Sequence, residues 1–166
     1  NPMVTKIRKA LTKRVLGELK KALDKRREEY QSLWAALGKV IKEGLYEDQD
    51  NKQKILEVSL FKSTKKNELI TLEDYVNQFA EGQDSIYYLS SENSELALNS
   101  PHLESFEAKG IDVILLSDPI DDFWLANTPD FKGKTFQSIT RGEIDLSNIG
   151  EPTKDSDNAE PILNDS

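Results

Sequence analysis

The sequence predicts an α/β protein, in which a three-helix coil is followed by a small α/β/α sandwich with a short, largely parallel sheet. Two observations carry this prediction. Apolar residues recur every three or four positions through the first third of the chain, which is the helical period. The remainder alternates short apolar runs with helical segments, and strands linked through helices favour a parallel sheet covered on both faces.

The coil is expected within residues 1–62, which carry three apolar stripes. The first stripe comprises Val4, Ile7, Leu11, Val15, Leu19 and Leu23. The second comprises Tyr30, Leu33, Trp34, Leu37 and Ile41. Gly44 is expected to end the second helix, and Trp34 to lie in the core. A third, shorter helix carries Ile55, Leu56 and Leu60.

The α/β module is expected over residues 63–142, after a polar break at residues 63–67. Thr71 can cap a helix that Gly82 stops, because a threonine hydroxyl accepts a hydrogen bond from the first helical turn. A strand at residues 86–89 and a short helix at residues 92–98 follow. A last strand is expected at residues 135–140.

The passage from Ser100 to Asp121 predicts helix, buried strand and helix in direct succession. Ser100 and Asp118 are N-cap residues, and a proline follows each of them at the first helical position, where its missing N–H is not needed. Gly110 suits the position that closes a helix. The apolar run at residues 113–116 is too short for a helix and too continuous for a half-exposed strand, so we expect it buried on both sides.

Composition narrows the class of protein. The 166 residues include no cysteine, which excludes disulfides and fits a reducing, cytoplasmic setting. No stretch approaches the ~20 apolar residues that a membrane-spanning helix needs. Residues 1–42 carry 12 Lys and Arg against 4 Asp and Glu, whereas the other residues carry 10 against 26. We interpret the basic front as a solvated helix face, and the acidic remainder disfavours nucleic acid.

Several segments, in order, resemble the middle segment of the heat shock protein 90 family of ATP-driven chaperones, of the bacterial high-temperature protein G type. They are Gly44-Leu45-Tyr46-Glu47-Asp48, Ser63-Thr64, Thr71-Leu72-Glu73-Asp74-Tyr75-Val76, Gln83 with Ile86-Tyr87-Tyr88, Ser100 to Asp121, and Phe131-Lys132-Gly133-Lys134. The resemblance covers residues 1–137 and assigns the chain to the second half of that segment.

This resemblance implies a chaperone module that transmits ATP-driven closure and binds non-native client proteins. Its partners would be the N-terminal ATPase and C-terminal dimerisation domains of the same chain, in a homodimeric parent. The resemblance places ATP, magnesium and a catalytic arginine before Asn1, so we expect no enzymatic activity and no cofactor in this segment, and a monomer in isolation. Residues 143–166 have the composition of an acidic linker towards the dimerisation domain.

The candidate client-binding residues are Asp122, Phe123, Trp124 and Leu125. Successive helical residues point about 100° apart, so Phe123 and Trp124 cannot enter the same core pocket. We expect one ring beside Ile120 in the core and the other partly exposed. An exposed ring offers a large contact area at low entropy cost, which suits weak binding of unfolded segments.

The sequence gives weaker support to other kinds of functional site. Residues 128–135 end like a phosphate-binding loop, but Thr128 stands where the first glycine belongs and a strand follows instead of a helix. The only histidine, His102, cannot build a zinc site or a triad alone. Asp118, Asp121 and Asp122 could serve a carboxylate-based hydrolase, although a capping box explains the first two. An interaction module unrelated to chaperones is the other alternative.

Overall fold

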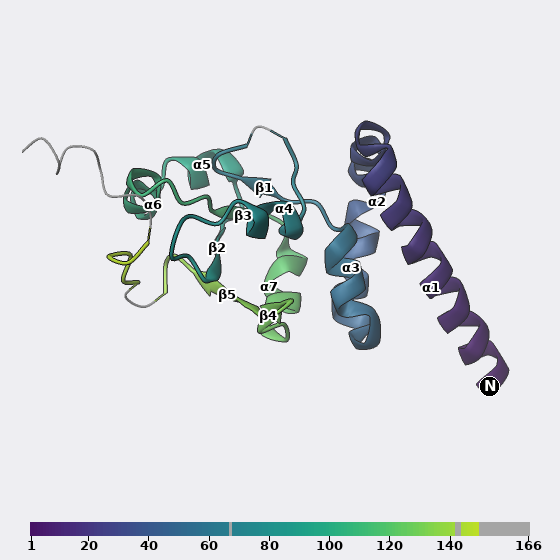
Figure 1. Cartoon of the computed structure of the whole chain (residues 1–166). Coiled ribbons are helices and arrows are strands. Elements are labelled where there is room, and N and C mark those ends of the chain that lie inside the picture. The colour runs from purple at the N-terminus through teal and green to yellow at the C-terminus, as the bar shows by residue number, and fades with distance from the viewer. Residues whose placement is uncertain (67, 142–143, 150–166) are drawn as a thin grey trace, which may run out of the picture.

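The computed structural model describes residues 1–66, 68–141 and 144–149. Its first part is the expected helical coil: α1 (Pro2–Lys25), α2 (Arg27–Glu47), a short 3₁₀ turn η1 (Gln49–Asn51) and α3 (Lys52–Val58). In Figure 1, α1 lies at the outer side of the coil, and α2 and α3 lie between it and the α/β part. Within the part of the chain that is described, no helix combines the length and apolar character needed to cross a bilayer.

The second part is built on a five-stranded sheet. Its strands are β1 (Lys62–Ser63), β2 (Ser85–Ser90), β3 (Ile114–Leu116), β4 (Asp130–Phe131) and β5 (Lys134–Ser138), in the order β1-β3-β2-β5-β4. The central strand β2 pairs in parallel with both β3 and β5. The two edge strands, β1 and β4, pair antiparallel with their neighbours. The expectation of a short, largely parallel sheet is therefore confirmed.

Helices cover both faces of this sheet. They are α4 (Leu72–Asn77), α5 (Ser94–Leu98), the 3₁₀ turn η2 (Pro101–Leu103), α6 (Glu104–Ala108) and α7 (Pro119–Ala126). Ile86 of β2 and Ile114 of β3 belong to one buried cluster with α4, α7 and the coil. Tyr87 and Leu115 belong to a second cluster with α5 and α6. This alternation follows from the pleat, which sends successive side chains to opposite faces.

Three predicted caps and one predicted helix end between residues 71 and 121 are confirmed. The side chains of Thr71, Ser100 and Asp118 each accept a hydrogen bond from the backbone that follows, and Ser100 caps the 3₁₀ turn η2, which leads into α6. Gly110 follows α6 with a φ of 71°, which glycine adopts without strain. The expectation that Gly82 stops the helix after Thr71 is wrong, because α4 already ends at Asn77 and Gly82 lies in the turn that follows, with a φ of 82°. Local signals therefore set where α4 and α7 begin and where α6 ends, but not where α4 ends.

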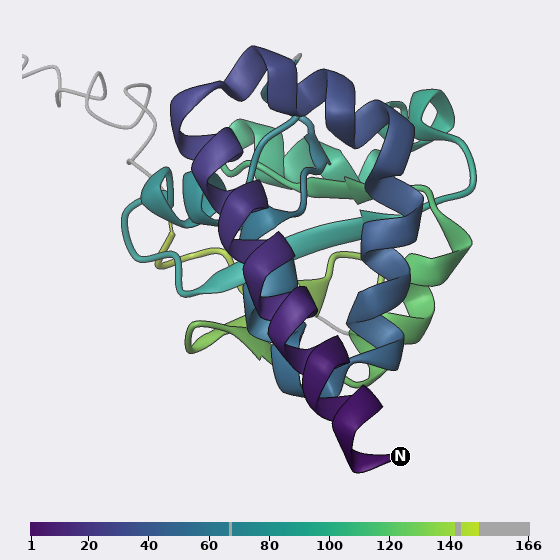
Figure 2. The same cartoon turned by 90° about the vertical axis from the view of Figure 1, so that its right-hand side faces the viewer.

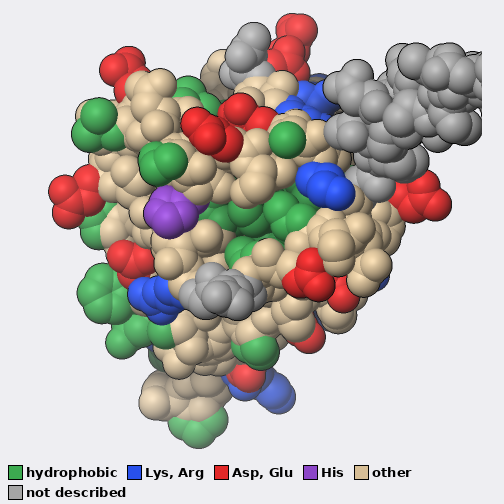
Figure 3. All heavy atoms as spheres, turned by 90° about the vertical axis from the view of Figure 1, so that its left-hand side faces the viewer, with side chains coloured by type: hydrophobic (Ala, Val, Ile, Leu, Met, Phe, Trp, Pro, Cys, Tyr) green, Lys and Arg blue, Asp and Glu red, His purple; other side chains and the backbone are tan. Residues whose placement is uncertain are grey.

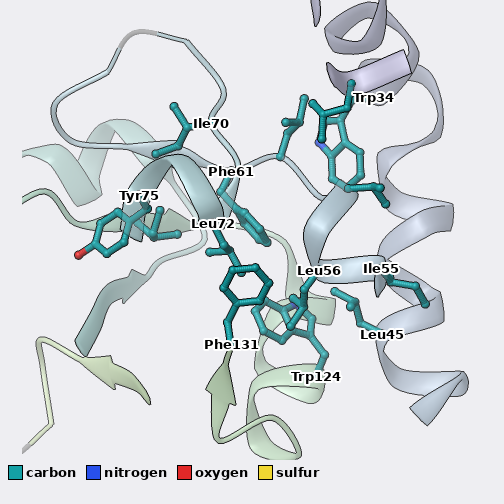
Figure 4. Packing of buried hydrophobic residues seen from close by; sticks show 14 of the residues in the cluster. Trp34, Leu45, Ile55, Leu56, Phe61, Ile70, Leu72, Tyr75, Trp124 and Phe131 are labelled. Carbon is teal, nitrogen blue, oxygen red and sulfur yellow. The ribbon is translucent and has the colours of Figure 1, made fainter. Parts of the chain in front are cut away.

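One core joins the coil to the sheet. Figure 4 shows Trp34 and Leu45 of the coil in the same buried cluster as Leu72 of α4 and Trp124 of α7. Trp34 is thus the core residue that its position predicts. Tyr30 ties α2 to the end of α3 by donating its hydroxyl to the carbonyl of Val58, and burial raises the pKa of this tyrosine to about 12. The predicted boundary near residue 63 does not separate two independent cores.

The N-terminal half of α1 departs from the prediction. Of its expected inward stripe, Leu23 is buried, but Val4, Ile7, Leu11 and Val15 are 50–60% exposed. Figure 2 shows the N-terminal end of α1 extending past α2 and α3. The periodicity correctly identifies an apolar face, but within the described residues nothing covers its first half.

Two boundaries also differ from the prediction. Helix α2 continues past Gly44 to Glu47. Gly44 is not a helix end but a point where α2 packs closely on α3, because a Cβ there would lie 3.1 Å from Cδ1 of Ile55. The polar break at residues 63–67 begins inside edge strand β1, which is too short to show a strand period. At the other end, Ile149 is buried in the second cluster, so part of the predicted linker packs on the α/β module, and residues 150–166 lie outside the described chain.

An ion pair between Arg27 and Asp74 joins the start of α2 to α4. Burial raises the pKa of Asp74, but the hydrogen bonds from Arg27 and Thr71 outweigh it and hold this pKa below 3.8. A carboxylate with a depressed pKa stabilises the fold above its unfolded pKa, and this stabilisation is lost as the pH falls through the folded pKa.

We therefore expect Asp74→Asn to lower the free energy of unfolding by about 1–2 kcal/mol at pH 7, the usual value of a helix cap with one charged partner. The difference from the unchanged chain should shrink as the pH falls from about 4 through the lowered folded pKa of Asp74, because the carboxyl group is protonated in both states only below that folded pKa. Urea unfolding at pH 7 and at about pH 2 measures both values. A difference that is the same at the two pH values would contradict this role of Asp74.

Candidate binding surface on helix α7

Helix α7 begins in a capping box. Asp118 accepts a hydrogen bond from the backbone N–H of Ile120 at 3.3 Å, and Asp121 accepts one in return from the N–H of Asp118 at 3.2 Å. Pro119 occupies the first helical position, as predicted. The helix therefore has a defined start directly after the buried strand β3, which fixes where its exposed residues lie.

Asp121 anchors this helix to the coil. Its carboxylate is fully buried and lies 3.0 Å from Nζ of Lys42 on α2. The indole N–H of Trp124 donates to the same carboxylate at 2.8 Å. Charges in a protein interior are tolerated only when paired and hydrogen-bonded, and Asp121 meets both conditions. The pair therefore fixes α7 against α2.

The ring of Trp124 is part of the core, which corrects its place in the predicted surface. It is 1% exposed and packs against Phe61 and Phe136, with ring centroids 6.1 and 5.6 Å away. Figure 4 shows its ring beside Leu56 and Phe131 in the buried cluster. The sequence offers both rings as candidates for the exposed position, and the helical rotation of about 100° between them turns Trp124 into the core and Phe123 to the surface.

Of the two adjacent rings, Phe123 is the exposed one, which agrees with the expectation that one ring is buried and the other exposed. Its side chain is 59% exposed and meets Tyr46 of α2 edge to face, with centroids 6.1 Å apart. Asp122 is also exposed and accepts a hydrogen bond from the Ser90 hydroxyl at 2.9 Å. Leu125 is partly buried against the core.

The structure thus leaves Asp122 and Phe123 accessible, and it adds Tyr46, which is 50% exposed. Sequence reasoning missed Tyr46 because it lies 77 positions before Phe123, on another helix. Only the packing of α2 against α7 brings the two rings together.

The other candidate sites are explained by structure. Asp121, with no exposed surface, cannot meet a substrate, and Asp118 caps the helix. Residues 130–138 form the β4–β5 hairpin, so the segment that ends like a phosphate loop is a turn between strands. His102 is exposed, and Figure 3 shows it on the surface of the α/β part. Across residues 1–66, 68–141 and 144–149, no three His, Cys, Asp or Glu residues form a group that could hold a metal ion.

The helical coil, fused through one core to a small sheet, has counterparts among known proteins. The sequence model described as "Hsp90 protein" matches residues 1–163. The chain therefore belongs to the Hsp90 family.

The similar proteins are named bacterial chaperones. The chaperone protein HtpG of Roseobacter denitrificans is 46% identical over 169 residues, which cover 99% of this chain and 27% of that protein. HtpG of Mycobacterium leprae is 44% identical, covering 92% of this chain and 24% of that protein. The chain thus spans about a quarter of the length of these relatives.

A solved structure supports the same assignment. The middle domain of a putative heat shock protein from Plasmodium falciparum matches with a TM-score of 0.79 and 28% identity, covering 85% of this chain and 60% of that one. The chain therefore has the fold of an Hsp90 middle domain.

Proposed function

We propose that this chain is a middle-domain module of an ATP-dependent chaperone that binds non-native client proteins through the exposed residues of α7. The exposure of Phe123 on a rigidly anchored helix carries this proposal. Exposed aromatic side chains supply large contact area and are frequent in the central contacts of protein interfaces. Asp122 lies beside the ring and adds a charge to the same surface.

In the parent protein, the module would transmit closure of an ATP-bound N-terminal domain towards a C-terminal dimerisation domain. The shared core supports this role, because α2 and α7 are joined by packing and by the Lys42–Asp121 pair and so move as one body. ATP and magnesium would bind elsewhere in the homodimeric parent.

The exposed stripe of α1 fits the same proposal. Val4, Ile7, Leu11 and Val15 would lie against another part of the parent, since this chain spans about a quarter of its relatives. A contiguous apolar surface of this kind marks an interaction site.

The test replaces Phe123 by serine in the 166-residue chain and measures binding to a labelled, permanently unfolded protein of basic composition, reduced and carboxamidomethylated ribonuclease A, by fluorescence anisotropy. We expect binding to weaken about fivefold or more, because removal of a central aromatic contact costs over 1 kcal/mol. The free energy of unfolding of this variant should change little, since the Phe123 ring is 59% exposed.

The matched control is Leu96→Ser, which removes a 68% exposed side chain from α5. Leu96 belongs to the opposite side of the sheet, so this variant should bind the unfolded protein as the unchanged chain does. Equal binding by the Phe123→Ser variant and the unchanged chain would rule out a client site on α7.

A further inference from the structure

The edge-to-face pair of Tyr46 and Phe123 is an exposed aromatic surface shared by two helices. Each ring is at least half exposed, and their centroids lie 6.1 Å apart. The rings come from the coil and from the α/β part, and the buried contact of Lys42 with Asp121, one turn away on α2, fixes the distance between the two helices. The pair is therefore preformed and loses little conformational entropy when it binds.

Exposed carboxylates surround this pair. Glu43 lies three positions before Tyr46 and so on the same side of α2, Glu47 follows Tyr46 directly, and Asp122 precedes Phe123. Within the described residues, these three acids take part in no ion pair. On the same side of α2, Lys42 is already paired with Asp121, and Lys39 is exposed four positions before Glu43. Three exposed carboxylates against one exposed lysine leave this surface with a net negative charge.

We propose that Tyr46 and Phe123 act together as one aromatic clamp, and that Glu43 and Asp122 make it select extended segments in which a large apolar side chain is flanked by lysine or arginine. This inference rests on the proposed client site and names the class of segment that the site takes. The apolar side chain packs across the exposed faces of the two contacting rings, while the flanking cations lie beside the carboxylates. Arginine and lysine also interact favourably with aromatic faces.

The charge pattern disfavours other occupants. An acidic segment would bring like charges together on the clamp, which is destabilising. A phosphate backbone would meet the same repulsion.

The test uses three labelled peptides that share one leucine–phenylalanine centre and differ only in four flanking residues, which are lysine, glutamine or glutamate. Binding to the 166-residue chain should be strongest for the lysine peptide and weakest for the glutamate peptide. We expect the two to differ about tenfold at low salt, because each exposed charge pair contributes up to about fivefold in affinity. The difference should shrink in 0.5 M salt, where charges are screened.

Two variants separate the rings from the carboxylates. Tyr46→Ser should weaken all three peptides about three- to tenfold, as loss of one aromatic contact does. Glu43→Gln combined with Asp122→Asn should reduce the preference for lysine over glutamate to about twofold. The controls are Leu37→Ser, an exposed apolar residue of α2, and Glu28→Gln with Glu95→Gln, which removes two distant charges.

The outcomes separate this inference from the client site itself. If Phe123→Ser weakens every peptide but Tyr46→Ser weakens none, α7 binds clients without a clamp, and the inference fails. If the glutamate peptide binds as well as the lysine peptide, the selectivity fails. If Phe123→Ser has no effect on any peptide, the proposed function fails as well.

Discussion

Replacing Trp124 by alanine should lower the free energy of unfolding by about 3–5 kcal/mol, the usual cost of removing a large buried aromatic side chain. The ring is 1% exposed and packs between Phe61 and Phe136, so its removal leaves a cavity that rigid neighbours cannot fill. The substitution also removes the indole N–H that donates to Asp121. Urea unfolding followed by circular dichroism measures the change from the shift in midpoint.

The neighbouring ring supplies the matched control. Phe123→Ala should cost about 1 kcal/mol or less, because the substitution removes a largely exposed side chain and one edge-to-face contact. The two adjacent aromatic residues should therefore separate into one that stabilises the fold strongly and one that contributes little to stability. Equal losses of stability in the two variants would contradict the placement of Trp124 in the core.

Replacing Lys42 by methionine should be nearly as damaging, with a loss of about 3–5 kcal/mol. Methionine keeps the length of the side chain but removes the charge that faces the fully buried carboxylate of Asp121. That carboxylate would keep its hydrogen bonds from Trp124 and from the backbone of Asp118, but it would lose its only cation within the described residues.

Replacing the other member of the pair, Asp121, should lower the free energy of unfolding by less. Asp121→Asn keeps an oxygen for the indole N–H, and Lys42 is 12% exposed, so its ammonium group can turn towards water. We expect a loss of about 1–3 kcal/mol, and a double variant that is less destabilised than the sum of the two. A Lys42→Met variant that is more stable than the Asp121→Asn variant would show that the Lys42–Asp121 pair does not fix α7 against α2.

Much of α7 was predictable because its determinants are local. Asp118, Pro119 and Asp121 specify the start of the helix within four residues, and the apolar run before them specifies a buried strand. Helical rotation alone required that Phe123 and Trp124 face different environments. The choice between them depends on where α7 sits relative to Phe61 and Phe136, and no local pattern contains that information.

The remaining differences have the same origin. The stripe on α1 predicts an apolar face correctly, but periodicity does not say what covers it, so Val4 and Leu11 were expected inside and lie exposed. The edge strands β1 and β4 have two residues each, fewer than an alternating pattern needs. Tyr46 joins Phe123 through packing between helices that are far apart in the chain.

The apolar stripe of α1 is a second exposed surface on which an unfolded segment could bind, and one measurement separates it from the surface on α7. The isotope-labelled chain is titrated with the lysine-flanked peptide while backbone amide resonances are followed by NMR. We predict that the amides of Tyr46, Asp122 and Phe123 shift with a common dissociation constant, and that those of Val4 and Leu11 do not. Shifts confined to residues 4–15 of α1 would contradict the assignment of client binding to α7.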